Sequence, residues 1–149
     1  MGYFVAAGSK KHHRFEGGLL SHSLETYHKA MELREKMIEK GCDLDLLPVG
    51  SVVIASLMHD LCKADELRYD PVSRSVYSLK KTHGHSQRSV RQVGYSGFEL
   101  TPMETDAILW HMGGKRYHED RWKHFSSHPL SHIIYWADKY SIQDHYCRR

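Results

Sequence analysis

The residues best suited to chemistry in this chain are an adjacent histidine and aspartate, His59 and Asp60. They follow the almost wholly apolar run that begins at Val52, and Lys63 follows one helical turn later. Neighbouring helical residues point about 100° apart, so these two side chains can bind one ion, or the carboxylate can bridge two ions. Burying both without a partner would be costly. Taken alone, the pair fits a metal site, an interior histidine–aspartate hydrogen bond, or an aspartate that simply ends the helix.

Four more histidine or aspartate residues occupy comparable positions in separate segments. His22 falls on an apolar stripe of the helix predicted from Leu19 to about Lys40, and His85 opens a short helical segment. His111 ends another helix, and Asp138 follows the apolar run I-I-Y-W-A. Each residue alone has a simpler explanation, such as a surface histidine or a helix ion pair. Together they indicate one shared site.

Length and cysteine content restrict the class of protein. A chain of 149 residues suits one domain, 1–149, which can bury roughly two-thirds of its unfolded surface. The three cysteines are scattered and odd in number, which favours reduced thiols in a cytosolic protein over a disulfide framework or a zinc ribbon. No apolar run approaches the roughly 20 residues of a membrane span. We therefore expect a cytoplasmic protein without a membrane partner.

The charge is mildly basic, at +3 with histidines neutral, and no long block of lysine and arginine occurs. Such a balance is compatible with anionic ligands but does not require a nucleic-acid surface. The 13 histidines cluster between or at the ends of helical segments, as expected if several converge on a site.

The hydrophobic pattern predicts an all-α bundle of five or six helices. Residues 1–18 form an extended lead-in over a helical core at 19–149, and residues 69–81 form a loop or a small hairpin. Thr101-Pro102-Met103-Glu104 combines a capping residue, a first-turn proline and a capping-box glutamate, which marks a helix start. The polar stretch 115–127 is expected to be a long loop. The last helix is expected from Pro129 to about Ile142.

The order His…His-Asp…His…His…Asp resembles the HD superfamily of metal-dependent phosphohydrolases. The local phrases that carry the resemblance are G-G-L-L-S-H-S-L at 17–24, M-H-D-L-C-K at 58–63, G-H-S-Q-R-S at 84–89 and W-H-M-G at 110–113. The lead-in F-V-A-A-G-S-K-K-H-H-R-F-E is similar to the segment that precedes the domain in bacterial and prophage-type HD proteins and in YhaM-like exoribonucleases. The resemblance covers nearly the whole chain, and it is specific for fold and metal site rather than for substrate.

The resemblance implies a set of site residues. The minimal single-metal set would be His22, His59, Asp60 and Asp138. His85 and His111 match the extra histidines of two-metal members, so a second ion bridged by Asp60 is expected, although these two histidines could instead hold substrate. Nitrogen and carboxylate ligands suit one or two ions of Fe, Mn, Co or Ni.

Cationic side chains near these phrases are candidates for binding substrate phosphate. Lys63 is expected to bind a phosphate or to orient Asp138, and it joins Asp60 as an expected catalytic residue. Arg88, Lys115 and Arg116 are further candidates. His12 and His13 could cap the site from the lead-in, but they are not counted among its members.

The expected function is hydrolysis of a phosphomonoester or phosphodiester of a nucleotide or similar small phosphorylated metabolite by a metal-activated water. A 3′-to-5′ exonuclease on short RNA or DNA is the alternative, less favoured because no separate binding domain and no aromatic and basic track are recognised. A third class is a non-catalytic, metal-stabilised regulatory or binding module. The complete ligand set argues against that class. The sequence does not indicate an oligomeric state.

Overall fold

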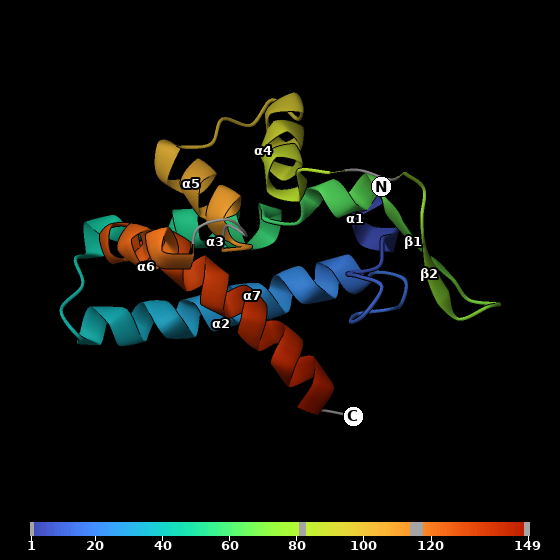
Figure 1. Ribbon diagram of the computed structural model, residues 1–149, viewed down its shortest axis with the longest axis horizontal. Coiled ribbons are helices and arrows are strands. Elements are labelled where there is room, and N and C mark those ends of the chain that lie inside the picture. The colour runs from blue at the N-terminus through green and yellow to red at the C-terminus, as the bar shows by residue number, and fades with distance from the viewer. Residues whose placement is uncertain (1, 81–82, 114–117, 148–149) are drawn as a thin grey trace.

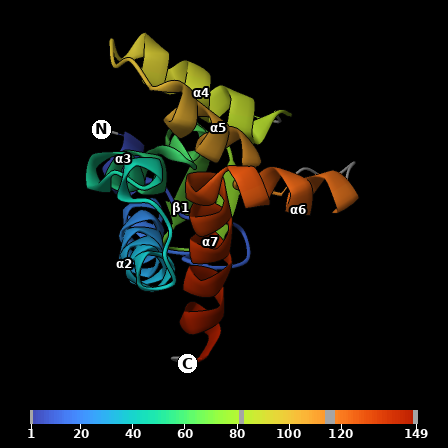
Figure 2. The ribbon, with the colours of Figure 1, turned by 90° about the vertical axis from the view of Figure 1, so that its left-hand side faces the viewer.

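A computed structural model, which describes residues 2–80, 83–113 and 118–147, confirms the all-α bundle (Figures 1 and 2). Short 3₁₀ segments and one small hairpin accompany the α-helices. In chain order the elements are α1 (Gly2–Val5), α2 (Gly18–Glu39), η1 (Leu44–Leu46), α3 (Val49–Met58), η2 (Leu61–Asp65), β1 (Leu67–Asp70), β2 (Ser75–Ser78), α4 (His85–Tyr95), α5 (Pro102–Trp110), α6 (His118–Ser127) and α7 (Pro129–Cys147).

The core lies where α2, α3, α5 and α7 pack together. Figure 1 shows α7 crossing α2, with α4 and α5 on the other side of α3. Small residues on α2 and α7 allow this close packing, since Ala30 and Ala137 are fully buried. The buried members of the main cluster are Ala30, Leu47, Val52, Ala55, Ala107, Ile108, Leu130, Ile133, Ile134 and Ala137.

The apolar run around Val52 is not one continuous helix. Helix α3 ends at Met58, His59 is its C-cap, and Asp60 takes φ −110° and ψ 14° before the 3₁₀ segment η2. That backbone region is sparsely populated and is common at functional residues. The break turns Lys63 out of the register that a continued α-helix would give it.

One stretch, Leu44–Asp65, is long and apolar enough to cross a membrane by length and composition, which the sequence analysis did not anticipate. In the fold this stretch is divided into η1, α3 and η2. Helix α3 has ten residues, so it is only about 15 Å long. It packs against α2, α5 and α7, and core helices commonly pass the same test of length and composition.

Of the loop or small hairpin predicted at 69–81, the structure has the hairpin, and its strands pair antiparallel from Leu67↔Ser78 to Asp70↔Ser75. The predicted long loop at 115–127 is wrong, because its second part is helix α6. Phe125 of α6 is 2% exposed and packs against aromatic rings of α7. This tertiary packing stabilises a helix that its polar composition did not suggest.

The lead-in is also less extended than expected. It begins with the short helix α1, and Ala6 and Ala7 behind it are fully buried. The carbonyl of Ala6 accepts a hydrogen bond of 3.0 Å from the amide of Leu19, which ties the lead-in to the start of α2. The capping box is confirmed at α5, where Thr101 and Glu104 bond reciprocally.

Candidate metal centre

The structure brings all six candidate ligand residues of the sequence analysis to one place. Six elements or their ends supply them, and each residue except His85 is nearly or fully buried. The residues are His22 of α2, His59 after α3, Asp60 before η2, His85 at the start of α4, His111 after α5 and Asp138 of α7.

One group of donor atoms comes from His22, His59, Asp60 and Asp138. His22 Nε2 lies 3.2 Å from His59 Nε2, 3.1 Å from Asp138 Oδ1 and 3.5 Å from Asp60 Oδ2. Two donors that each bind one ion at 2.1 Å are about 3.0 Å apart at octahedral angles and about 3.4 Å at tetrahedral angles. The separations in this group therefore fit one shared cation.

A second group forms on the other oxygen of Asp60. His85 Nε2 contacts Asp60 Oδ1 directly, and His111 Nε2 lies 3.5 Å from the same oxygen. The two oxygens of one buried carboxylate thus face two separate sets of imidazole nitrogens. This is the arrangement that a carboxylate bridging two ions requires.

The hydrogen bonds of the outer ring nitrogens leave lone pairs facing the centre. His59 Nδ1 donates to the carbonyl of Ser56 at 2.8 Å, and His111 Nδ1 donates to that of Ile108 at 2.6 Å. A carbonyl only accepts, so each Nδ1 carries the hydrogen and each neutral ring presents its Nε2 lone pair. His111 Nε2 is buried and has no hydrogen-bond partner among the described residues. A nitrogen orphaned in this way fits a metal ligand.

Two side chains that the sequence analysis missed hold the remaining rings. Ser141 Oγ donates to the carbonyl of Asp138 at 2.8 Å and lies 3.2 Å from His22 Nδ1, which can donate to it. Cys62 Sγ lies 2.8 Å from His85 Nδ1, whereas in the sequence Cys62 is only one of three scattered cysteines. Ser141 stands one turn after Asp138, but nothing in a lone serine distinguishes it from other core hydroxyls.

Comparison with protein families identifies an HD domain over residues 19–142. The chain belongs to the HD-domain family. HD domains are in general metal-dependent phosphohydrolases that bind divalent metal. No curated protein and no solved structure matches the chain.

We call the six residues His22, His59, Asp60, His85, His111 and Asp138 the HD centre. The charges in this centre are balanced by mutual pairing. Burial opposes ionisation of Asp60, but Lys63 and His59 outweigh it and hold the pKa of this carboxyl well below its usual range. Burial likewise disfavours charge on Asp138, but His22 and His59 lower its pKa. Both carboxylates are therefore ionised at neutral pH and available as ligands.

Contacts with buried carboxylates raise the pKa values of His22 and His85. Burial lowers the pKa of His22, but hydrogen bonds with Asp138 and Asp60 outweigh this effect and raise it. Burial is also the largest effect at His85, and the contacts with Asp60 and Cys62 reverse it, raising the pKa to about 9. Protons therefore compete with cations for these nitrogens in the HD centre.

The cationic candidates divide into three cases. Lys63 Nζ contacts Asp60 Oδ2, so this lysine does lie at the HD centre. Arg88 forms an ion pair with Glu66, which directs its guanidinium to that carboxylate. Lys115 and Arg116 lie outside the described residues.

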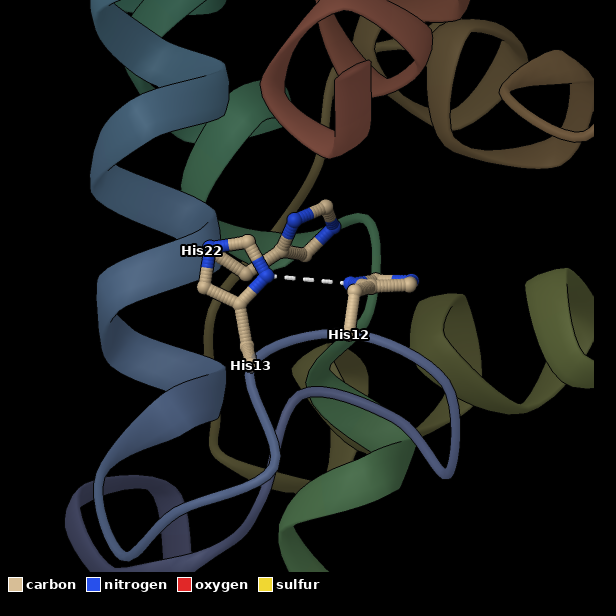
Figure 3. A group of neighbouring side chains, drawn as sticks. All are labelled: His12, His13 and His22. Carbon is tan, nitrogen blue, oxygen red and sulfur yellow. Dashed lines mark hydrogen bonds between the residues drawn. The ribbon is translucent and has the colours of Figure 1, made fainter. Parts of the chain in front are cut away.

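The lead-in places two further histidines beside His22, and the sequence analysis did not count either as a site member. His13 is fully buried and His12 is 8% exposed. The ring centroids of His12 and His13 each lie 5.1 Å from that of His22 (Figure 3). Burial, with smaller contributions from His22 and Lys63, lowers the pKa of His12 to about 3. In the sequence, the sign that these two histidines belong near the site is the doublet His12-His13 shortly before G-G-L-L at 17–20.

Proposed function

We propose that this HD domain hydrolyses a phosphomonoester or phosphodiester of a nucleotide or a similar small phosphorylated metabolite. The observation that carries the proposal is the placement of Asp60, whose two oxygens face two groups of imidazole nitrogens. His22, His59 and Asp138 would hold one ion with Asp60, and His85 and His111 would hold a second. The donor set suits Fe, Mn, Co or Ni.

Lys63 and His85 would act beside the cations in binding the substrate. When bound, divalent cations activate a water and offset the negative charge that grows on phosphoryl oxygens. Lys63 supplies a fixed positive charge beside Asp60, and its side chain is 16% exposed, so it can also reach a substrate phosphate. His85 is more exposed, with 27% of its side chain accessible, and together with Lys63 it borders the open side of the HD centre.

A surface feature supports a second candidate, a 3′-to-5′ exonuclease on short RNA or DNA. Trp122 of α6 stacks on Trp136 of α7 at 6.2 Å, and Trp136 stacks on Tyr140 at 5.6 Å. Lys139 on the same helix lies 3.6 Å from Asp138 of the HD centre. Rows of aromatic rings beside cations bind single strands by stacking. The sequence did not reveal this row, because α6 was expected to be a loop.

The test is turnover by protein stripped with a chelator and reloaded with Mn²⁺, Fe²⁺, Co²⁺ or Ni²⁺. Nucleotides, generic phosphomonoesters and phosphodiesters, and short oligonucleotides are compared as substrates. Release from small esters supports the first candidate, and release from oligonucleotides alone supports the second. Metal binding without any turnover would instead identify a regulatory or binding module.

We expect Asp60→Ala to abolish metal binding and turnover, because it removes a ligand of both groups. Circular dichroism should show helix content close to that of the wild type. Asp45→Ala, at an exposed position in η1, is the matched control and should retain both properties. Unchanged turnover in Asp60→Ala would remove this residue from the site.

A further inference from the structure

We propose that His12 accepts a hydrogen bond from an O–H group at the open side of the HD centre, and that His13 and Glu25 hold it in the required tautomer. The O–H group belongs either to the attacking water or to a sugar hydroxyl of the substrate. This inference rests on the proposed function, and it adds the lead-in to the machinery of the reaction.

The position of His12 is the first argument. Its ring centroid lies 5.1 Å from that of His22, close to the 5.2 Å between His22 and His59 within the HD centre. It lies within electrostatic reach of Lys63 and Asp138. His22 and His59 are fully buried, whereas His12 retains some exposed surface, as Lys63 and His85 do. His12 therefore borders the HD centre and is the more exposed of the two lead-in histidines.

The hydrogen bonds behind His12 define the tautomer that we propose for it. Glu25 Oε2 lies 3.0 Å from His13 Nε2, and an ionised carboxylate only accepts, so His13 Nε2 carries the hydrogen. In the proposed arrangement His13 is neutral, and the lone pair on its Nδ1 lies 3.0 Å from His12 Nδ1. His12 then donates across this distance from a protonated Nδ1, and its Nε2 presents a lone pair.

The free lone pair faces away from the residues that fix it. Figure 3 shows the far edge of the His12 ring pointing away from both His13 and α2. Among the described residues no hydrogen bond of His12 Nε2 is found, so this nitrogen can accept from a bound water or hydroxyl. A nucleophile, an imidazole and an orienting group in series form the same arrangement that activates nucleophiles in other enzymes.

The backbone of the lead-in is built to hold these rings in place. His13 adopts φ 50°, which is unusual for a residue other than glycine. Its carbonyl accepts from the amide of Gly8 at 3.0 Å, and a Cβ on Gly18 would lie 2.0 Å from that same oxygen. Ser9 Oγ accepts from the amide of His12 at 2.8 Å. Local strain of this kind persists where surrounding structure enforces it, commonly at functional sites.

The structural half of the proposal is tested by ¹⁵N NMR of the histidine rings in the metal-free protein, which requires no turnover. We expect His12 to carry its hydrogen on Nδ1. In Glu25→Gln the acceptor of His13 changes, and we expect the His12 signal to move toward a mixture of tautomers. Hydrogen on Nε2 of His12 in the wild type would overturn the proposal.

The functional half is tested with p-nitrophenyl phosphate and bis(p-nitrophenyl) phosphate, which have no sugar hydroxyl, and with AMP and 2′,3′-dideoxy-AMP. We expect His12→Phe to lower kcat at least about tenfold while KM and bound metal stay near wild type. His12→Gln, which keeps an acceptor, should recover part of kcat, and Glu25→Gln should lower kcat less than His12→Phe. His28→Phe, at an exposed position of α2, is the control and should behave as wild type.

The pattern across substrates identifies the O–H group. Loss of kcat on the nitrophenyl esters assigns it to the attacking water, and loss confined to AMP assigns it to the sugar. A kcat within twofold of wild type on all substrates would overturn the proposal, as would loss of bound metal in His12→Phe, which would make His12 a ligand. Absence of turnover in the wild type itself would instead contradict the proposed function, and the NMR result would still stand.

Discussion

At the residue scale, the HD centre depends on which ring nitrogen of each histidine is left for a cation. Two rings are held by carbonyls, those of Ser56 and Ile108, and one is held by the hydroxyl of Ser141. Such outer hydrogen bonds set the tautomer and the orientation of a ligand. We therefore expect the affinity for metal to depend on residues that do not contact the ion.

Ser141→Ala tests this dependence. The substitution removes the acceptor of His22 Nδ1, so the ring loses its fixed orientation, and we expect metal affinity to fall about 10- to 100-fold. Ser126→Ala is a matched control, because Ser126 also donates to a carbonyl three residues earlier but lies on the exposed side of α6. The dissociation constant for Co²⁺ measures the effect. Equal affinity in the two variants would contradict the role of Ser141.

The pKa of His85 predicts how metal binding responds to pH. Burial lowers this pKa, but Asp60 and Cys62 raise it to about 9, so the metal-free ring is protonated at pH 7. A cation must displace that proton, and the affinity of the second ion should rise by up to about tenfold per pH unit until pH 9, then level off. Co²⁺ titrations at several pH values, with proton release followed by calorimetry, measure this. An affinity for the second ion that does not change with pH would contradict it.

All six candidate ligands could be predicted from the sequence, because residue type and position at a helix end or on an apolar face both marked them. Their partners could not be predicted. Backbone carbonyls such as that of Ile108 leave no trace in residue type. His12 and His13 were recognised only as neighbours of the site, since their role depends on a loop held by Gly8 and Gly18.

At the element scale, the HD centre depends on where α3 ends, because His59 and Asp60 directly follow its last residue. The α-helix stops at Asp60, whose two oxygens face four imidazoles, and the chain beyond it continues as a 3₁₀ segment. Periodicity detected the apolar helix but not this break, since L-C-K-A-D contains no glycine or proline. Periodicity also did not predict α6, because this helix depends on the packing of Phe125 against α7.

Helix α5 offers a test of how an element positions the HD centre, because His111 follows its last turn. Thr101 caps its start, so Thr101→Ala should lower the free energy of unfolding by about 1 kcal/mol. Thr101→Ser keeps the hydroxyl and should remain close to wild type. Chemical denaturation measures both. A loss in the serine variant as large as that in the alanine variant would show that the hydroxyl is not the stabilising group.

At the scale of the whole molecule, the HD centre joins parts of the chain that are distant in sequence. His22 and Asp138 lie 3.1 Å apart although they belong to α2 and α7, the first and last long helices. His85 and His111 add α4 and α5. Cations bound here would connect most elements of the bundle, so the stability of the fold is expected to depend on metal.

The unfolded chain has no preformed site, so a bound ion stabilises the folded state by mass action. At a free ion concentration about 1,000-fold above Kd, the gain is about 4 kcal/mol, which for a domain of this size raises Tm by about 10 °C. We expect chelator-treated protein to show this rise on addition of Mn²⁺ or Co²⁺ in thermal denaturation. Asp45→Ala should show the same rise, and Asp60→Ala should show none, because Asp60 contributes an oxygen to both donor groups. An equal rise in Asp60→Ala would mean that the ion binds elsewhere and would separate the metal dependence of the fold from the HD centre.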